Sequence, residues 1–173
     1  MATDAKPAPP LTMDRPEIDP HDFRTALGNF VTGVTVITTR GADGNLAGMT
    51  ANSFNSVSLD PPLIVWSISM FAPSLAAFRE NNYFAVHVLA ADQTQLSNQF
   101  ARPSENKFAD LEVEEGLGGV PLLDGVTARF ECRNEYNYYG GDHVVMIGRV
   151  ERYHHWHKKP LVFHRGRYCA LVD

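Results

Sequence analysis

Residues 34–50 read VTVITTRGADGNLAGMT. The first six residues of this stretch are β-branched, which favours a strand. Ala42-Asp43-Gly44 is typical of a tight turn, so residues 46–50 are predicted to pair back on the first strand as a hairpin. The two strands of such a hairpin are antiparallel.

Further strands are predicted on both sides of this hairpin, and short helices lie between some of them. The strand patterns cover residues 63–69, 83–89, 126–137, 144–153 and 161–171, the last with a break at Gly166. The first helix is capped by Asp19, has Pro20 in its first turn and places apolar residues on one face, namely Phe23, Ala26, Leu27 and Phe30. A second helix covers residues 74–80, with Leu75 and Phe78 inward. A third opens with Asp92 and Gln95 in capping-box spacing and buries Leu96 and Phe100.

About seven strands without regular helical crossovers favour a mainly β protein: an antiparallel barrel with short peripheral helices. No GxGxxG turn lies between a strand and a helix, which argues against a Rossmann fold. Residues 1–20 are rich in proline and are predicted to form a mobile N-terminal tail. Residues 21–173 are predicted to form one domain.

Charge and composition restrict the possible partners. The net charge is -5, which argues against nucleic acid or an anionic membrane as the main partner. The longest apolar run, residues 63–68, is too short to span a bilayer, and no secretory signal is recognised. Two cysteines, Cys132 and Cys169, form no CxxC pair. We therefore expect a soluble, cytoplasmic protein with a small-molecule or protein partner.

The segment 50–58 is unusually polar for a region between two strands. It holds six hydroxyl or amide side chains in nine positions: Thr50, Asn52, Ser53, Asn55, Ser56 and Ser58. One interpretation is a site for a planar polar ligand such as the isoalloxazine ring of a flavin, whose edge needs several hydrogen-bonding partners. The other is a polar surface strand and turn. The composition of the segment leaves both interpretations open.

A series of motifs then runs in order from residue 23 to the C-terminus. They are FRTALGNFVTGVTV at residues 23–36, TANS at 50–53, SLDPP at 58–62, FA at 100–101, GDH at 141–143, IGRV at 147–150 and PLV at 160–162. In this series the chain resembles the flavin reductase-like family, the short-chain reductases of two-component flavin monooxygenases. The resemblance implies a split β-barrel, a homodimer, FMN or FAD near the subunit interface, and NADH or NADPH as hydride donor.

The resemblance also implies roles for individual residues. The isoalloxazine and ribityl chain would lie against Thr50, Ala51, Asn52, Ser53 and Ser56, and the phosphate would lie near Ser67, Ser69 and Ser74. The flavin tail would be enclosed by Phe100 and Ala101, followed by Lys107 as an anion contact and by Phe108. Asn106 stands where the family has an acid. His143 would contact and orient the nicotinamide, so that hydride transfer occurs at about 3–3.5 Å between the reacting atoms.

The cluster His154-His155-Trp156-His157 lacks a nearby carboxylate or cysteine to complete a ligand set, so a solvated strand end is favoured over a metal site. The preferred function is reduction of flavin by NAD(P)H, with an oxygenase or another acceptor as partner. Three alternatives stay open. A held flavin would reduce an acceptor such as a cobalt corrinoid, the barrel would bind flavin or haem without turnover, or it would oxidise a pyridoxal-type phosphate.

Overall fold

The computed structural model describes residues 17–104 and 106–171. Most of the segment predicted to be a proline-rich tail, residues 1–16, lies outside the described residues. No helix in the described part of the chain is long and apolar enough to cross a membrane.

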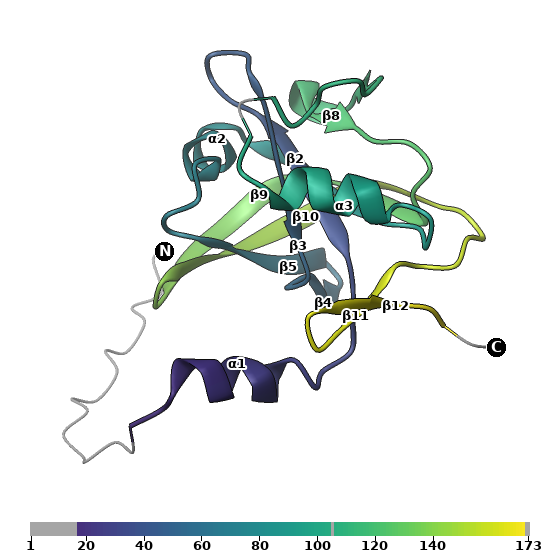
Figure 1. Ribbon diagram of the computed structural model, residues 1–173. Coiled ribbons are helices and arrows are strands. Elements are labelled where there is room, and N and C mark those ends of the chain that lie inside the picture. Colours follow the sequence, from purple (N-terminus) through teal and green to yellow (C-terminus); the bar gives the residue numbers. More distant parts are fainter. Residues whose placement is uncertain (1–16, 105, 172–173) are drawn as a thin grey trace.

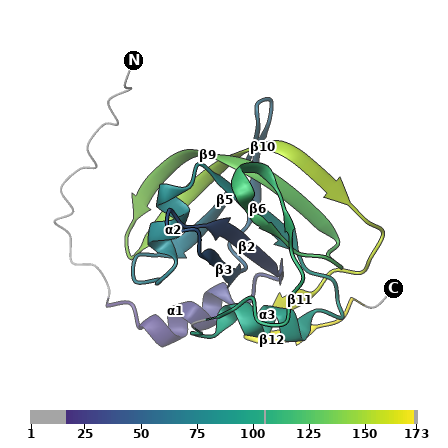
Figure 2. The same ribbon diagram turned by 90° about the horizontal axis from the view of Figure 1, so that it is seen from above.

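One seven-stranded antiparallel sheet dominates the fold, with strand order β3-β2-β6-β9-β10-β5-β4. Its strands are β2 (Thr35–Arg40), β3 (Leu46–Ala51), β4 (Asn55–Leu59), β5 (Pro62–Ser69), β6 (Tyr83–Val88), β9 (Ala128–Gly140) and β10 (His143–His155). The sheet curves round so that β3 approaches β5, and the long β9–β10 hairpin arches over it (Figures 1 and 2). The predicted antiparallel split barrel is confirmed.

The remaining strands of the described residues form two small sheets. β1 (Thr32–Gly33), β11 (Val162–His164) and β12 (Arg167–Cys169) form one, and β7 (Glu114–Glu115) pairs with β8 (Pro121–Leu122) in the other. The short helix η1 (Leu117–Gly119) lies between β7 and β8. The predicted break at Gly166 is confirmed, because it separates β11 from β12.

The barrel core is built around an aromatic cluster. Trp66 is fully buried, and its ring meets the rings of Phe78 and Phe84 edge-on at 4.9 and 5.6 Å. Ile64 and Ile68 flank Trp66 on the same face of β5, whereas the alternate residues of that strand point to the outer face. The strand therefore has one face in the core and one face free to carry polar side chains.

The helices follow the predicted pattern in two cases of three. α1 (Pro20–Leu27) begins at Asp19, whose carboxylate accepts a hydrogen bond from His21 N at 2.8 Å. α2 (Leu75–Glu80) buries Phe78, as predicted. The capping box predicted for α3 (Thr94–Ala101) is wrong.

The residue before α3 is Gln93, and its side chain makes no capping bond to the helix. It bonds instead to Ala90 N at 2.9 Å and Asp124 O at 2.8 Å. Contacts with these two other segments fix the chain before the helix, so Asp92 is not the N-cap.

The β9–β10 hairpin contains two irregularities that bend it. The register shifts between Ile147 and Gly148 and again between Val150 and Arg152. Glu135 of β9 and Glu151 of β10 are the residues left without a partner at these two shifts. Arg133 lies 3.2 Å from the carboxylate of Glu135 and 3.4 Å from that of Glu151, so it links the two. Such bulges increase the local twist and bend the strands.

Candidate functional site

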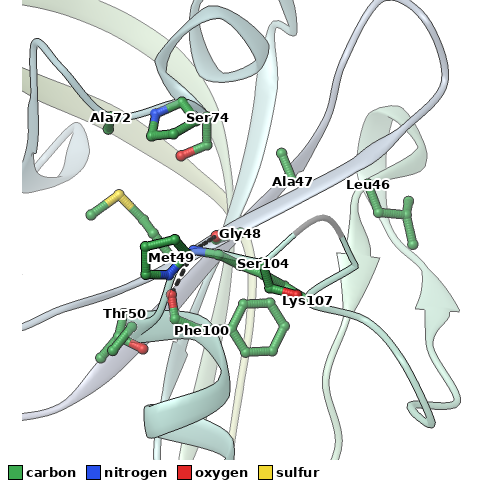
Figure 3. Close-up of a pocket in the computed structure, with 13 residues that line it drawn as sticks. Leu46, Ala47, Gly48, Met49, Thr50, Ala72, Ser74, Phe100, Ser104 and Lys107 are labelled. Atoms are coloured by element: carbon green, nitrogen blue, oxygen red, sulfur yellow. Dashed lines mark hydrogen bonds between the residues drawn. The ribbon is translucent and has the colours of Figure 1, made fainter.

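A cavity of about 710 Å³ opens beside β3, the loop before α2 and the end of α3 (Figure 3). Its lining is mostly small or apolar, with three hydroxyl groups and one lysine: Leu46, Ala47, Gly48, Met49, Thr50, Ala72, Pro73, Ser74, Phe100, Ala101, Pro103, Ser104 and Lys107. A largely apolar cleft with a few polar groups is typical of a small-molecule site.

Phe100 and Gly48 shape one wall of this cavity. The Phe100 ring is fully buried and packs edge-on against Phe108 at 5.0 Å. A Cβ atom on residue 48 would lie only 2.6 Å from Cε1 of Phe100. The absence of a side chain at Gly48 is therefore what allows α3 to pack this closely on β3.

Lys107 places an ammonium group in the cavity wall. Its Nζ donates to Phe100 O at 2.8 Å and to Gly48 O at 3.2 Å (Figure 3). Burial lowers the pKa of Lys107 from its ordinary value. The two carbonyls take two of the three N–H donors, which leaves one for a ligand.

Two hydroxyl groups from different elements also line the cavity. Thr50 donates its hydroxyl proton to Ser97 O at 2.6 Å, which ties β3 to α3 and leaves the Thr50 oxygen as an acceptor. Ser74 precedes α2, and its side chain makes no capping bond to that helix. Both groups face a space bounded by Ala101, the fifth of the predicted site residues found here.

The remaining predicted residues are not part of the cavity lining. Ala51 is buried, and Phe108 packs behind Phe100. Asn52 and Ser56 are exposed, at the bend after β3 and on β4. Ser53 crosses to β5, where its Oγ accepts from Ser67 N at 3.0 Å and donates to Ser67 O at 3.3 Å.

His143 opens β10 on the outer face of the sheet. It pairs in register with Ser69, and the next outward residue, Val145, pairs with Ser67. The same β5 segment leads to the cavity, because Ser69 O accepts from Ala72 N at 3.0 Å. The predicted polar residues of β5 and His143 thus share one face, whose edge adjoins a wall of the cavity.

The imidazole of His143 is paired with its neighbour. Nδ1 of His143 lies 2.7 Å from Oδ1 of Asp142. This hydrogen bond, together with the charge of the imidazole when protonated, lowers the pKa of Asp142. The arrangement is a hydrogen-bonded carboxylate–imidazole pair at an accessible turn.

Comparison of the chain with known protein families shows which family it belongs to. The family model described as "Flavin reductase like domain" matches residues 27–172. The chain belongs to the flavin reductase-like family. The match spans the whole barrel and both groups of residues described above.

Several members of the flavin reductase-like family are similar to the chain. FMN reductase (NADH) SmoA of Agrobacterium fabrum is 47% identical, covering 84% of this chain and 83% of the relative. The reductase component of the flavin-dependent trigonelline monooxygenase of Acinetobacter baylyi is 43% identical over 85% of this chain, and the chain spans only 47% of that protein. The NADH:FAD oxidoreductase SgcE6 of Streptomyces globisporus, solved with NAD and FAD fragments, has a TM-score of 0.83 at 36% identity, covering 91% of this chain and 98% of that one.

Several cavity residues were not singled out from the sequence as members of the flavin site. They are Leu46, Ala47, Gly48, Met49, Ala72, Pro73, Pro103 and Ser104. One usable signal was Gly48, because a glycine inside a strand often marks a close approach of another element or ligand. The others are apolar or flank turns, and only the tertiary fold brings them together.

The histidine cluster at the end of β10 does not form a metal site in the described residues. His154 stacks with Trp156 at 6.2 Å, and His155 meets His157 edge-on at 6.2 Å. Within the described ranges, no group of three or more potential ligands is placed to hold a metal ion.

Proposed function

We propose that this chain is an NAD(P)H-dependent flavin reductase that transfers hydride from a reduced nicotinamide to FMN or FAD and supplies reduced flavin to a partner monooxygenase. The observation that carries the proposal is the family match over residues 27–172 together with the cavity that five of the predicted site residues line. Relatives named as NADH-dependent reductases and as reductase components of monooxygenases support turnover rather than storage of flavin.

The cavity fits a flavin by the chemistry of its lining. Phe100, Ala101 and Pro103 offer an apolar wall, and Lys107 offers a fixed cation with one N–H free for a phosphate oxygen. Thr50 and Ser74 offer hydroxyl oxygens. A bound flavin supplies the hydride acceptor, while these side chains hold and orient it.

The outer face of β5 and β10 would present the hydride donor. His143 and Ser69 are neighbours in register, and Val145 and Ser67 continue the same face. In this proposal His143 hydrogen-bonds the nicotinamide, and the face positions its ring next to the flavin. Positioning is the main catalytic demand, because well-oriented reactants gain several orders of magnitude in rate from proximity alone.

We also propose that the protein acts as a cytoplasmic homodimer. α1 buries none of its residues within the chain, and the apolar side chains of Phe23, Leu27 and the following Phe30 are 52%, 60% and 74% exposed. Tyr136 and Tyr138, on β9 of the β9–β10 hairpin, are half-exposed. Apolar surface of this extent is typical of a subunit interface, and a second copy is the occupant that the resemblance implies.

The first test is oxidation of NADH and NADPH, followed at 340 nm, by the purified protein with increasing FMN or FAD. The expected result is saturable oxidation that depends on added flavin, and the better flavin is identified by its kcat/KM. Flavin binding without oxidation of either nicotinamide would overturn the proposal and favour a binding module.

A second test addresses the cavity. Lys107→Met is expected to raise the KM for flavin about tenfold or more, because a charge-assisted hydrogen bond to phosphate is lost. Lys158→Met is the matched control, since Lys158 Nζ also donates to a carbonyl, that of Gly125, at 2.8 Å, but does not line this cavity. An unchanged flavin KM in a folded Lys107→Met protein would remove Lys107 from the site.

A further inference from the structure

The turn that begins β10 holds Asp142 and His143 on a fixed backbone. Asp142 O accepts a hydrogen bond from Met70 N at 2.9 Å, and His143 pairs with Ser69 of β5 and Gly140 of β9. The neighbouring backbone is therefore tied on two sides. On this support, the Asp142 carboxylate lies 2.7 Å from Nδ1 of His143.

This contact decides which nitrogen of a neutral His143 carries the proton. An ionised carboxylate only accepts hydrogen bonds, so the nitrogen facing it must be the N–H. Asp142 stays ionised because its hydrogen bond with His143 lowers the carboxyl pKa. Nε2 of the neutral ring is then left with a lone pair and can act only as a hydrogen-bond acceptor.

We propose that Asp142 is a positioning residue that holds His143 with its proton on Nδ1, so that Nε2 accepts a hydrogen bond from the carboxamide NH₂ of the reduced nicotinamide. The inference rests on the proposed function, in which His143 contacts the nicotinamide. It adds a basis for substrate specificity, because the site recognises the amide NH₂ group, which a nicotinamide has and a 3-acetylpyridine analogue lacks. An analogue that offers only a carbonyl would face an acceptor with no proton to share.

Substitution of Asp142 removes this preference. In Asp142→Ala the acceptor that holds the proton on Nδ1 is lost, so the neutral ring also takes the tautomer in which Nε2 is a donor. Asp142→Asn is a weaker change, because its amide can accept from Nδ1–H as well as donate to Nδ1. Asp124→Ala is a matched control, because Asp124 is an exposed acid in another loop and is not one of the site residues described above.

The experiment measures kcat/KM for NADH and for reduced 3-acetylpyridine adenine dinucleotide with saturating flavin, in wild type and in each variant. The two donors differ in intrinsic reactivity, so the quantity compared is the ratio of their kcat/KM values. The expected result is that kcat/KM for NADH divided by kcat/KM for the analogue falls about fivefold in Asp142→Ala and stays unchanged in Asp124→Ala, since one hydrogen bond is weakened. An unchanged ratio in Asp142→Ala would overturn the inference.

A second readout does not depend on turnover. The ¹⁵N chemical shifts of the neutral His143 ring distinguish a protonated nitrogen from one with a lone pair. The proton is expected on Nδ1 in the wild type and is expected to move in part to Nε2 in Asp142→Ala. A His143 ring with its proton on Nε2 in the wild type would also overturn the inference.

His143→Ala separates this inference from the proposed function. If the wild type oxidises no nicotinamide, the proposed function fails. If His143→Ala lowers NADH turnover while the Asp142 variants keep the wild-type ratio, the role of Asp142 alone fails. If His143→Ala leaves turnover unchanged, the nicotinamide contact fails, and the inference fails with it.

Discussion

Gly48 shapes the cavity by what it lacks. A Cβ atom at this position would lie 2.6 Å from Phe100 Cε1 and 3.3 Å from Ile37 O. We predict that Gly48→Ala lowers the free energy of unfolding by about 1–3 kcal/mol, because the buried Phe100 ring must move. Urea denaturation followed by circular dichroism measures the loss.

The control for this change is Gly33→Ala, since a Cβ atom at residue 33 meets nothing within 4 Å. Its unfolding midpoint is expected to stay close to that of the wild type. Equal midpoints for the two variants would mean that the Phe100 ring moves aside at little cost, and that the close packing of α3 on β3 does not depend on glycine.

His87 is a buried histidine that is held neutral. Nδ1 lies 3.0 Å from Val36 O, and Nε2 accepts from Leu123 N at 3.1 Å, so the ring links β6 to two other segments. Burial, with a smaller contribution from Arg129, lowers the pKa of His87 to about 3. An unfolded chain protonates this histidine near its ordinary pKa of 6.5, whereas the folded protein does not.

The sign of the pH dependence follows directly. The contribution of His87 to stability is complete above pH 6.5 and is lost as the pH falls toward 3. Between pH 7 and pH 5 this group alone is expected to reduce the free energy of unfolding by about 2 kcal/mol. Urea denaturation at both pH values measures this change in the free energy of unfolding. His87→Gln is a reference that cannot titrate, and its free energy of unfolding should fall by about 2 kcal/mol less than that of the wild type. Equal decreases in the two proteins would contradict the assignment of this pH dependence to His87.

At the scale of elements, α1 within a single chain depends on its cap more than on packing. It has eight residues and buries none of them within the chain, and isolated helices of this length are marginal. We predict that Asp19→Ala, which removes the bond to His21 N, costs about 1 kcal/mol of helix stability. Hydrogen exchange of the α1 amides should accelerate about fivefold in this variant.

Asp22→Ala is the comparison for this prediction, because Asp22 is also acidic and in the first turn but does not cap the helix. It removes the same charge, so it reports only the interaction with the helix dipole. If Asp22→Ala accelerates exchange as much as Asp19→Ala, charge rather than the cap stabilises α1.

Local chemistry explains which elements the sequence predicted correctly. The β2–β3 hairpin was predictable because β-branched strands and a turn rich in small residues specify each other within a few positions. β4 was not predicted as a strand, because its exposed residues are polar or isolated apolar ones that pair only with β5. The cap of α3 was mispredicted because Gln93 is fixed by Ala90 and Asp124, from outside the helix.

The site divides in the same way. Thr50, Ser74, Phe100, Ala101 and Lys107 line the cavity. Thr50, Phe100 and Ala101 stand in the family motifs, and the resemblance as a whole implied the other two. Segments 46–49 and 72–73 join them only because β3 and the loop before α2 meet in the folded chain. No local sequence pattern predicts that these two segments lie together.

At the scale of the whole molecule, two surfaces of one chain must cooperate. Among the described residues, the cavity and the His143 face adjoin through residues 69–72, but His143 is not part of the cavity lining. α1 lies below the barrel in Figure 1, and its C-terminal end is tied to the β11–β12 hairpin, because Arg165 bonds to Asn29. In the proposed homodimer a second copy would cover the exposed apolar residues of α1, and the family resemblance implies that the flavin lies near the subunit interface.

This argument gives a final prediction. Wild type should sediment at twice the 19.2 kDa of one chain, whereas Leu27→Asp should sediment as a folded monomer, because a charge is placed in the apolar contact. Thr25→Asp is the control and should remain dimeric, because Thr25 is exposed and, two residues before Leu27, lies on the opposite side of α1. The Leu27→Asp monomer is expected to lose most flavin-dependent NADH oxidation while it keeps its β-sheet circular dichroism. A monomeric wild type would contradict the dimer, and a fully active monomer would show that one chain forms a complete site.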